Sequence, residues 1–277
     1  MSGSSQPETR FPGRREAGFS ILLTNDDGIN APGLDALRQA LAPLARLTVL
    51  APDHNWSAAG HTKTMHKPLR VHHVPLQNGT KAYTTTGAPS DCVALALLGI
   101  LPRRPDLVVS GINQGPNLGH DVTYSGTVAG AMEAVIFGLP AVAVSLDSYE
   151  SQDFSLAAQV AARVVCRVME RGLPAGVFLN VNVPCLPAGS EVPGVAITRM
   201  GRRVYRDVLV ERQDPRGRPY YWIGGDIPGG HLDEGTDIWA VANGYVSVTP
   251  MRLDLTAHEL IPELQQWKFR SQKFPKP

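Results

Sequence analysis

Short apolar runs alternate with helical patterns along the first two thirds of the chain, and this alternation limits the possible folds more than any other feature. The run at 20–24 (SILLT) is followed by leucines at helical spacing between 34 and 44, and then by a second apolar run at 47–50 (LTVL). A strand, a helix and a strand in this order form a right-handed crossover, which requires a parallel sheet with helices on its faces. We therefore predict an α/β fold.

The same alternation continues to about residue 183. It predicts a strand pair at 69–74 and 81–85 joined through Asn78-Gly79, a helix that begins with Ser90 as its N-cap, strands at 106–110, 141–145 and 178–183, and helices from about Thr127 and over 154–171. Together these elements predict a doubly wound, mostly parallel sheet.

The pattern changes near residue 184. Two stretches that alternate polar and apolar residues, 204–212 and 219–223, predict a long β-hairpin, followed by a strand at 244–249 and a C-terminal helix at 257–267. We divide the chain into a disordered tail (1–19), a catalytic α/β domain (20–183) and a smaller β-rich extension (184–277). Because a two-stranded ribbon is marginal alone, we expect a homodimer or homotetramer formed through the 203–223 hairpin and the C-terminal region.

Composition excludes several classes of protein. A formal net charge of +1 gives no broad basic surface, so we expect no nucleic-acid polymer as partner. No apolar run approaches the roughly 20 residues of a membrane span, and residues 1–19 contain no secretory apolar core. The three cysteines are far apart and fit no zinc spacing, which favours a reducing, cytoplasmic setting.

Three polar segments each follow a predicted strand: Asn25–Gly28, 53–61 and 111–127. Parallel strands end at one edge of the sheet, and ligands bind there, where the strand order reverses. We therefore expect these three segments to meet.

Asp26 and Asp27 are adjacent carboxylates at the first of these ends. They repel each other unless a cation or a proton lies between them. Ser57 and Asn113 can add neutral oxygen atoms, and an all-oxygen set favours Mg²⁺ or Mn²⁺ over Zn²⁺. The alternative is an ordinary polar turn in which Asp27 caps the following helix.

The third segment leads through Tyr124 into Ser125, Gly126 and Thr127, the predicted start of a helix. Free amides at such a helix terminus suit a phosphate group. The alternative is that Ser125 is only an N-cap. We expect Thr127→Val and Gly126→Ala to weaken phosphate binding while leaving the metal site intact.

These segments, in this order, resemble the SurE family of nucleotidases (stationary-phase survival proteins). The resemblance covers about residues 20–260 and is carried by ILLTNDDGINAPG, APDHNWS, TTGAPSDCVALAL, DLVVSGINQGPNLGHDVTYSGTVAGAMEA, LNVNVP and GTDIWAVANGYVSVTP. The long fourth motif is highly specific, whereas NDDG alone is weak.

The resemblance implies a Rossmann-like phosphatase that cleaves nucleoside 5′- and often 3′-monophosphates, with short polyphosphate as a further substrate in some members. It implies one divalent cation per subunit, Mg²⁺ or Mn²⁺, held by Asp26, Asp27, Ser57 and Asn113, with Asp26 and Asp27 as the catalytic pair. It places phosphate contacts on Asn117, Ser125, Gly126 and Thr127.

Two residues depart from the family pattern beside Ser57. Ala58 stands where glycine is common, and Trp56 stands where a basic residue is frequent, so the shape of this loop can differ.

Two other functions compete with this one. A nucleotide-binding module without catalysis could use the same sheet edge and helix terminus. A serine esterase could use Ser57 or Ser125, but the chain lacks the G-x-S-x-G elbow because Thr123 stands two residues before Ser125.

Overall fold

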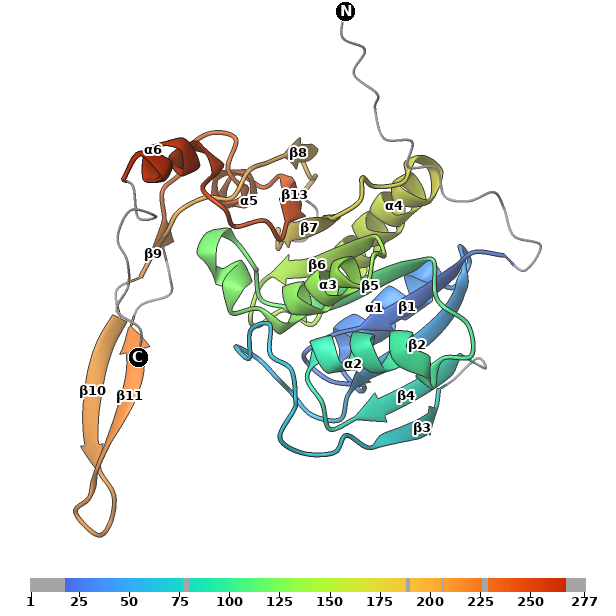
Figure 1. Ribbon diagram of the computed structural model, residues 1–277, viewed down its shortest axis with the longest axis horizontal. Helices are drawn as coiled ribbons and strands as arrows, with labels where there is room; N and C mark the ends of the chain where they lie inside the picture. The colour runs from blue at the N-terminus through green and yellow to red at the C-terminus, as the bar shows by residue number, and fades with distance from the viewer. Residues whose placement is uncertain (1–17, 77–79, 188–189, 206, 226–228, 268–277) are drawn as a thin grey trace, which may run out of the picture.

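The protein is described from a computed structural model that covers residues 18–76, 80–187, 190–205, 207–225 and 229–267, without the side chains of 207 and 225. Its centre is one nine-stranded sheet in the order β3-β4-β2-β1-β5-β6-β7-β13-β8 (Figure 1). The predicted α/β class with a doubly wound, mostly parallel sheet is confirmed.

Six neighbouring strands of this sheet are parallel. They are β4 (Lys81–Thr85), β2 (Arg46–Pro52), β1 (Ser20–Thr24), β5 (Leu107–Gln114), β6 (Ala141–Asp147) and β7 (Val177–Pro184). At one edge, β3 (Val71–Pro75) runs antiparallel to β4, as the predicted strand pair requires. The predicted Asn78-Gly79 turn lies outside the described residues.

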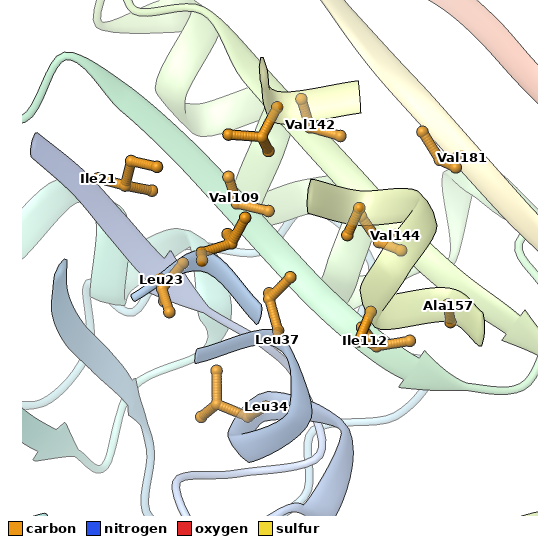
Figure 2. Close-up of a cluster of buried hydrophobic side chains, with 14 of the residues drawn as sticks. Ile21, Leu23, Leu34, Leu37, Val109, Ile112, Val142, Val144, Ala157 and Val181 are labelled. Carbon is orange, nitrogen blue, oxygen red and sulfur yellow. The ribbon is translucent and has the colours of Figure 1, made fainter. Parts of the chain in front are cut away.

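Helices cover both faces of the sheet, and the strands are apolar on both sides. On β1, Ile21 and Leu23 pack toward α1 (Pro32–Leu41) and α4 (Ser155–Arg171), in the cluster that Figure 2 shows. Leu22 points the other way, toward α2 (Pro89–Leu95) and α3 (Gly126–Ile136). Successive strand residues face opposite sides, so burial on both faces explains the continuous apolar runs in the sequence.

Strand order reverses at β1, whose neighbours are β2 on one side and β5 on the other. The carboxyl ends of β1 and β5 are adjacent there, with Thr24 paired to Ser110. The register of β5 shifts between Ser110 and Asn113, so the last residues of β5 leave the regular ladder. This switch point positions the site described below.

The C-terminal segment contributes to the same sheet. Strand β13 (Val246–Arg252) pairs antiparallel with β7, and β8 (Val195–Ile197) pairs parallel with β13. Two strands of the predicted extension thus belong to the main sheet. The division of the chain at residues 183 and 184 stays a prediction. The predicted disordered tail (1–19) lies outside the described residues except for 18 and 19.

The predicted hairpin is present as β10 (Asp207–Gln213) and β11 (Pro219–Gly225), which project away from the sheet (Figure 1). Short elements precede and follow it: β9 (Arg203–Val204) pairs with β12 (Gly229–Gly230), and α5 (Asp237–Ala242) leads to β13. The predicted C-terminal helix is a 3₁₀ turn at His258–Leu260 followed by α6 (Ile261–Gln266).

Ser90 is not the N-cap of its helix, so this prediction is wrong. Helix α2 begins at Pro89 with Ala88 as N-cap, because proline is well suited to the first helical position. The carboxylate of Asp91 accepts a hydrogen bond of 3.0 Å from the Ala88 N–H. The hydroxyl of Ser90 donates instead to the carbonyl of Thr62.

Among the described residues, the helices are all too short or too polar to cross a membrane.

Candidate active site

The three polar segments do meet at the end of β1. The Trp56 N–H of the second segment donates to the Asp26 carbonyl at 2.8 Å. The carboxylate of Asp27, in the first segment, joins the other two. It accepts hydrogen bonds from Asn55 Nδ2 of the second segment and from the Gln114 N–H of the third, each at 3.3 Å. The convergence that was inferred from strand order is therefore confirmed.

Asp26 is buried, with 3% of its surface exposed, against the first turn of α3. Its carboxylate accepts a hydrogen bond from the Thr127 hydroxyl. Burial raises the pKa of Asp26 to about 6; the Thr127 hydrogen bond acts to lower it, and the charge of Asp27 acts to raise it. A buried carboxylate that is held near a second one is costly to ionise without a cation.

Gly126 packs directly on Asp26. A Cβ atom at residue 126 would lie 2.7 Å from the Asp26 Cβ and 2.9 Å from its Oδ2. Since Thr127 also hydrogen-bonds Asp26, substitutions at Gly126 or Thr127 reach the predicted metal ligand. We therefore replace the expectation that Thr127→Val or Gly126→Ala would spare the predicted metal site: both substitutions should disturb it.

Asp27 is half-buried, and this burial raises its pKa, while the hydrogen bond from the Gln114 N–H acts to lower it. It does not cap the following helix, because α1 begins at Pro32 with Ala31 as N-cap. Asn55 of the second segment and Gln114 of the third thus hold this carboxylate, which remains available to bind a cation.

The two neutral ligands predicted for a metal, Ser57 and Asn113, lie within two residues in the chain of Asn55 and Gln114, which contact Asp27. Ser57 is exposed, and its N–H donates to Asn55 Oδ1 at 2.6 Å. Asn113 is half-buried; its side-chain N–H donates to the Gly115 carbonyl at 2.7 Å, which leaves the amide oxygen for a ligand. Within the described residues, no group of three or more His, Cys, Asp or Glu side chains could hold a metal ion. The metal assignment therefore depends on two carboxylates with neutral oxygen donors and stays a prediction.

Ser125 is the N-cap of α3, because its hydroxyl accepts a hydrogen bond of 3.0 Å from the Val128 N–H. The first N–H groups of an α-helix have no acceptor within the helix. The N–H of Val128 is capped by Ser125, and that of Thr127 hydrogen-bonds the Asp26 carboxylate, whose pKa it acts to lower. Helix geometry therefore leaves the N–H of Gly126 for a ligand. The phosphate contacts of Ser125, Gly126 and Thr127 stay predictions.

A buried hydrogen-bond network holds the backbone and the side-chain N–H of Asn117. Its N–H donates to Asn182 Oδ1 at 2.8 Å, and its carbonyl accepts from the amides of Asn180 and Asn182 at 2.9 and 3.0 Å. Its own side-chain N–H donates to the Ser145 hydroxyl at 2.7 Å. The network leaves the Asn117 amide oxygen for a ligand, and its predicted phosphate contact is untested.

Sequence reasoning missed three supporting residues. Asn180 and Asn182 belong to the LNVNVP motif, and their alternation places both on one face of β7, toward Asn117. Asp237 was also missed, because it lies far away in the sequence from the loop that it contacts. The signal for the two asparagines was present: polar residues at a spacing of two in an otherwise apolar strand.

The fold and the switch-point site define a doubly wound α/β protein with paired carboxylates next to a helix N-terminus. The chain belongs to the SurE family: the family model described as survival protein SurE matches residues 21–207.

Two curated relatives are each named 5′-nucleotidase SurE. The one from Chloroflexus aggregans is 53% identical over 251 residues, which are 90% of this chain and 99% of the relative. The one from Herpetosiphon aurantiacus is 53% identical over 249 residues, or 89% of this chain and 97% of the relative. Among solved structures, the SurE protein from Aquifex aeolicus is similar with a TM-score of 0.78 and 45% identity, covering 90% of this chain and 99% of that one.

Proposed function

We propose that this chain is a metal-dependent 5′-nucleotidase, which hydrolyses nucleoside 5′-monophosphates to nucleoside and phosphate. Membership of the family and the names of its relatives support the reaction. The observation that carries it is the contact of Asp26 with Thr127, which brings a carboxylate and a helix N-terminus to one point. Such a point can hold both a cation and an anion.

The donor atoms fit a hard divalent cation. Asp26, Asp27, Ser57 and Asn113 offer only oxygen, and the raised pKa values of both carboxyl groups are what a cation would relieve. When bound, one Mg²⁺ or Mn²⁺ ion would neutralise charge on the phosphoryl group and orient or activate water.

The other residues have roles that follow from their positions. The N-terminus of α3, at Ser125, Gly126 and Thr127, binds non-bridging phosphate oxygens, with the N–H of Gly126 as donor and the dipole of α3 favouring negative charge. The backbone of Asn117 is held by Asn180 and Asn182. Its side-chain amide donates to the Ser145 hydroxyl, so this amide stays in place when substrate binds. The Thr127 hydroxyl donates its hydrogen bond to Asp26 and holds that carboxylate in position, so it is not the donor to the substrate.

The wider substrate range belongs to the same proposal. Nucleoside 3′-monophosphates and short polyphosphate carry the same terminal phosphate, so we propose them as further substrates. We propose that the protein acts on small molecules, which the near-neutral charge of the chain supports, and that it does so in the cytoplasm, which its three widely spaced cysteines support.

The proposed assembly is a homodimer or homotetramer through the hairpin. Large apolar side chains on β10 and β11 are exposed to solvent in the single chain, among them Leu209, Trp222 and Ile223. Burying such a patch needs a partner surface, and we propose a second copy of the chain. Light scattering at micromolar concentration should give a dimer or tetramer, whereas a fully active monomer would contradict it.

A phosphate-release screen tests the activity. The substrates are AMP, GMP, 3′-AMP, glycerol phosphate and tripolyphosphate, each with Mg²⁺, Mn²⁺ or EDTA. We expect release from the 5′-monophosphates that needs metal. Tight binding of AMP with no phosphate release would instead support the binding module.

A further inference from the structure

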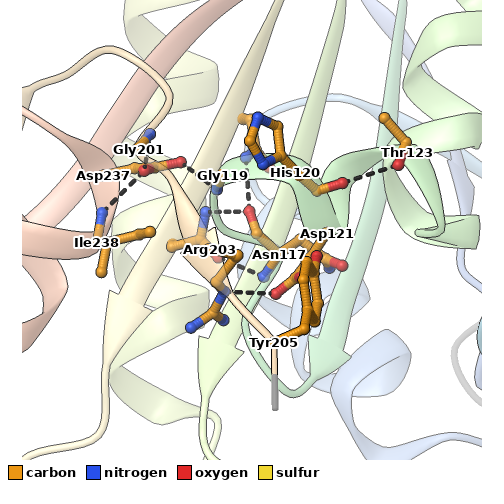
Figure 3. A network of polar contacts seen from close by, with 12 residues as sticks. Asn117, Gly119, His120, Asp121, Thr123, Gly201, Arg203, Tyr205, Asp237 and Ile238 are labelled. Atoms are coloured by element: carbon orange, nitrogen blue, oxygen red, sulfur yellow. Dashed lines mark hydrogen bonds and ion pairs between the residues drawn. The ribbon is translucent and has the colours of Figure 1, made fainter. Parts of the chain in front are cut away.

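A second polar network lies behind the third polar segment, where the C-terminal part of the chain meets it (Figure 3). Its centre is Asp237, the first residue of α5, whose side chain is fully buried. The carboxylate accepts three backbone hydrogen bonds: from Gly119 at 2.8 Å, from Gly201 at 2.7 Å and from Ile238 at 2.8 Å.

This carboxylate is not needed to cap its own helix. The N-cap of α5 is Thr236, whose hydroxyl accepts the Trp239 N–H at 3.2 Å. Asp237 instead joins two backbone segments that are packed closely together, since a Cβ atom at Gly119 would lie 2.7 Å from the Gly201 carbonyl oxygen. A buried charge with this many donors is a device for holding those segments in one place.

A second carboxylate makes the reverse connection. Asp121 lies in the third segment and accepts from Arg203 Nε at 2.6 Å and from the Tyr205 hydroxyl at 2.5 Å. Figure 3 shows Asp237 beside Gly119, at the start of the short stretch of chain that also carries Asp121. Each segment thus supplies a carboxylate to the other.

The stretch held in this way is the 3₁₀ turn Gly119–Thr123, and it leads straight into the phosphate helix. The turn is followed by Tyr124 and then by Ser125, the N-cap of α3. The Tyr124 N–H donates back to the Asp121 carbonyl at 3.0 Å, so a hydrogen bond connects the turn to the residue that precedes the N-cap of α3. Movement of Gly119 would therefore move the amides of Gly126 and Thr127.

We propose that Asp237 is a positioning residue for catalysis, which holds the 119–123 turn and through it the phosphate-binding end of α3. The proposal rests on the proposed function of that site. Asp237 itself touches no substrate, and it acts through the backbone N–H of Gly119. The C-terminal segment thereby controls the affinity for the phosphoryl group and, because Thr127 also hydrogen-bonds Asp26, has a smaller effect on the predicted metal site.

The substitution Asp237→Asn tests this with almost no change in volume. An amide replaces one accepting oxygen by an NH₂ group, which then faces a backbone N–H donor. The matched control is Asp233→Asn. Asp233 is exposed and precedes α5 in the same loop, and the Thr236 hydroxyl donates to its backbone carbonyl rather than to its side chain. Asp121→Asn and Tyr205→Phe weaken the opposite end of the connection.

Three measurements are made on the full-length wild-type and variant proteins. They are the competitive Ki of inorganic phosphate against AMP hydrolysis, the Kd of Mn²⁺, and amide hydrogen exchange over 117–126. For Asp237→Asn we expect the phosphate Ki to rise about tenfold and exchange at Gly119 to quicken about tenfold, because a small displacement costs much at an oriented site. The Mn²⁺ affinity of Asp237→Asn should fall by less than its phosphate affinity, since Asp26 is reached only through Thr127. All three values of Asp233→Asn should stay within about twofold of wild type.

A folded Asp237→Asn protein whose phosphate Ki stays at the wild-type value overturns the proposal, even if its exchange is faster. If Asp237→Asn does not fold, Asp121→Asn decides: an unchanged phosphate Ki there overturns the proposal as well. If the wild-type protein hydrolyses no nucleotide, the proposed function fails. Exchange still tests the hold on the loop in that case, and unchanged exchange in Asp237→Asn overturns it independently.

Discussion

The hydroxyl of Thr127 donates a hydrogen bond to the carboxylate of Asp26, which joins the first turn of α3 to the end of β1. Both side chains are buried. A cation bound by Asp26 and a phosphate bound by α3 would therefore be coupled through this hydrogen bond. A substitution that displaces one of the two residues should change the affinity for both ligands.

Thr127→Val is expected to lower kcat/KM for AMP by at least about tenfold, because the buried Asp26 carboxylate loses a hydrogen bond worth about 1–3 kcal/mol. Thr127→Ser keeps the hydroxyl and should stay within about threefold of wild type. Titrating Mn²⁺ in both variants separates the causes. A valine variant with normal Mn²⁺ dependence and normal kcat would contradict the support role of Thr127.

Removal of metal is expected to abolish activity. The donors Asp26, Asp27, Ser57 and Asn113 are all oxygen, and none of the side chains assigned to the proposed site is cationic, so the helix dipole alone would face the charge of the phosphoryl group. Exhaustive dialysis against EDTA, with elemental analysis, should give an inactive protein that Mn²⁺ or Mg²⁺ restores. Full activity in a sample with no detectable metal would rule out the proposed chemistry.

The sequence predicts the fold well because the central strands of the sheet are apolar on both faces, as Leu22 and Leu23 on β1 illustrate. It also predicts that 25–28, 53–61 and 111–127 converge, because strand order alone brings their ends together. Helix α5 was not predicted, since its six residues are too short to show a helical period.

The contacts between these segments could not be predicted in the same way. The bond from Gly119 to Asp237 joins residues 118 apart in the sequence, and nothing local marks Asp237 as buried. The use of Thr127 for Asp26 was likewise hidden, because a threonine at a helix start fits a phosphate contact equally well. Ser90 misled for a related reason: a good capping residue stood one position inside the helix that Pro89 begins.

Ala58→Gly is expected to stabilise the protein. Ala58 has φ of 58°, a left-handed conformation in which a Cβ atom costs about 1–2 kcal/mol. Part of this gain is lost because glycine is more flexible in the unfolded chain, so we expect a net gain of about 0.5–1 kcal/mol. Chemical denaturation measures it. Ala59→Gly is the control; it lacks the strain and should be destabilising, and an equal gain there would contradict the explanation.

Glu133 is expected to make stability depend on pH. Burial acts to raise the pKa of Glu133, but hydrogen bonds from His61 at 2.9 Å and Lys63 at 3.0 Å, with their charges, outweigh it and the pKa lies below its ordinary value of 4.5. A lowered pKa in the folded state gives stability that is present above about pH 4.5 and lost as the pH falls through the folded value.

Glu133→Gln should therefore be less stable than wild type at pH 7, by about 1–2 kcal/mol because the Lys63 end is half exposed. The difference should shrink toward pH 3. Urea denaturation from pH 3 to 7 measures it, with Glu170→Gln, from an exposed ion pair with Arg167, as the control. A difference that is constant over this range would exclude the charge of Glu133 as the cause.

The last prediction separates a metal phosphatase from a serine hydrolase. Asp26 and Asp27 supply the negative charge that would hold the cation, whereas Ser57 is exposed and supplies one neutral oxygen that water can replace. Asp26→Asn and Asp27→Asn should therefore each lower kcat by roughly 10²-fold or more, as expected for loss of a charge-stabilising group.

Ser57→Ala should be milder, and added Mn²⁺ should partly restore its kcat. A serine nucleophile predicts the reverse: Ser57→Ala would be inactive at every Mn²⁺ concentration, and rapid quench of the wild type would trap a phosphoserine. The same quench reveals an acyl phosphate if Asp26 attacks the substrate directly. Measuring kcat for the three variants across a Mn²⁺ titration decides between these mechanisms, because only the metal phosphatase links the loss at Ser57 to the concentration of the ion.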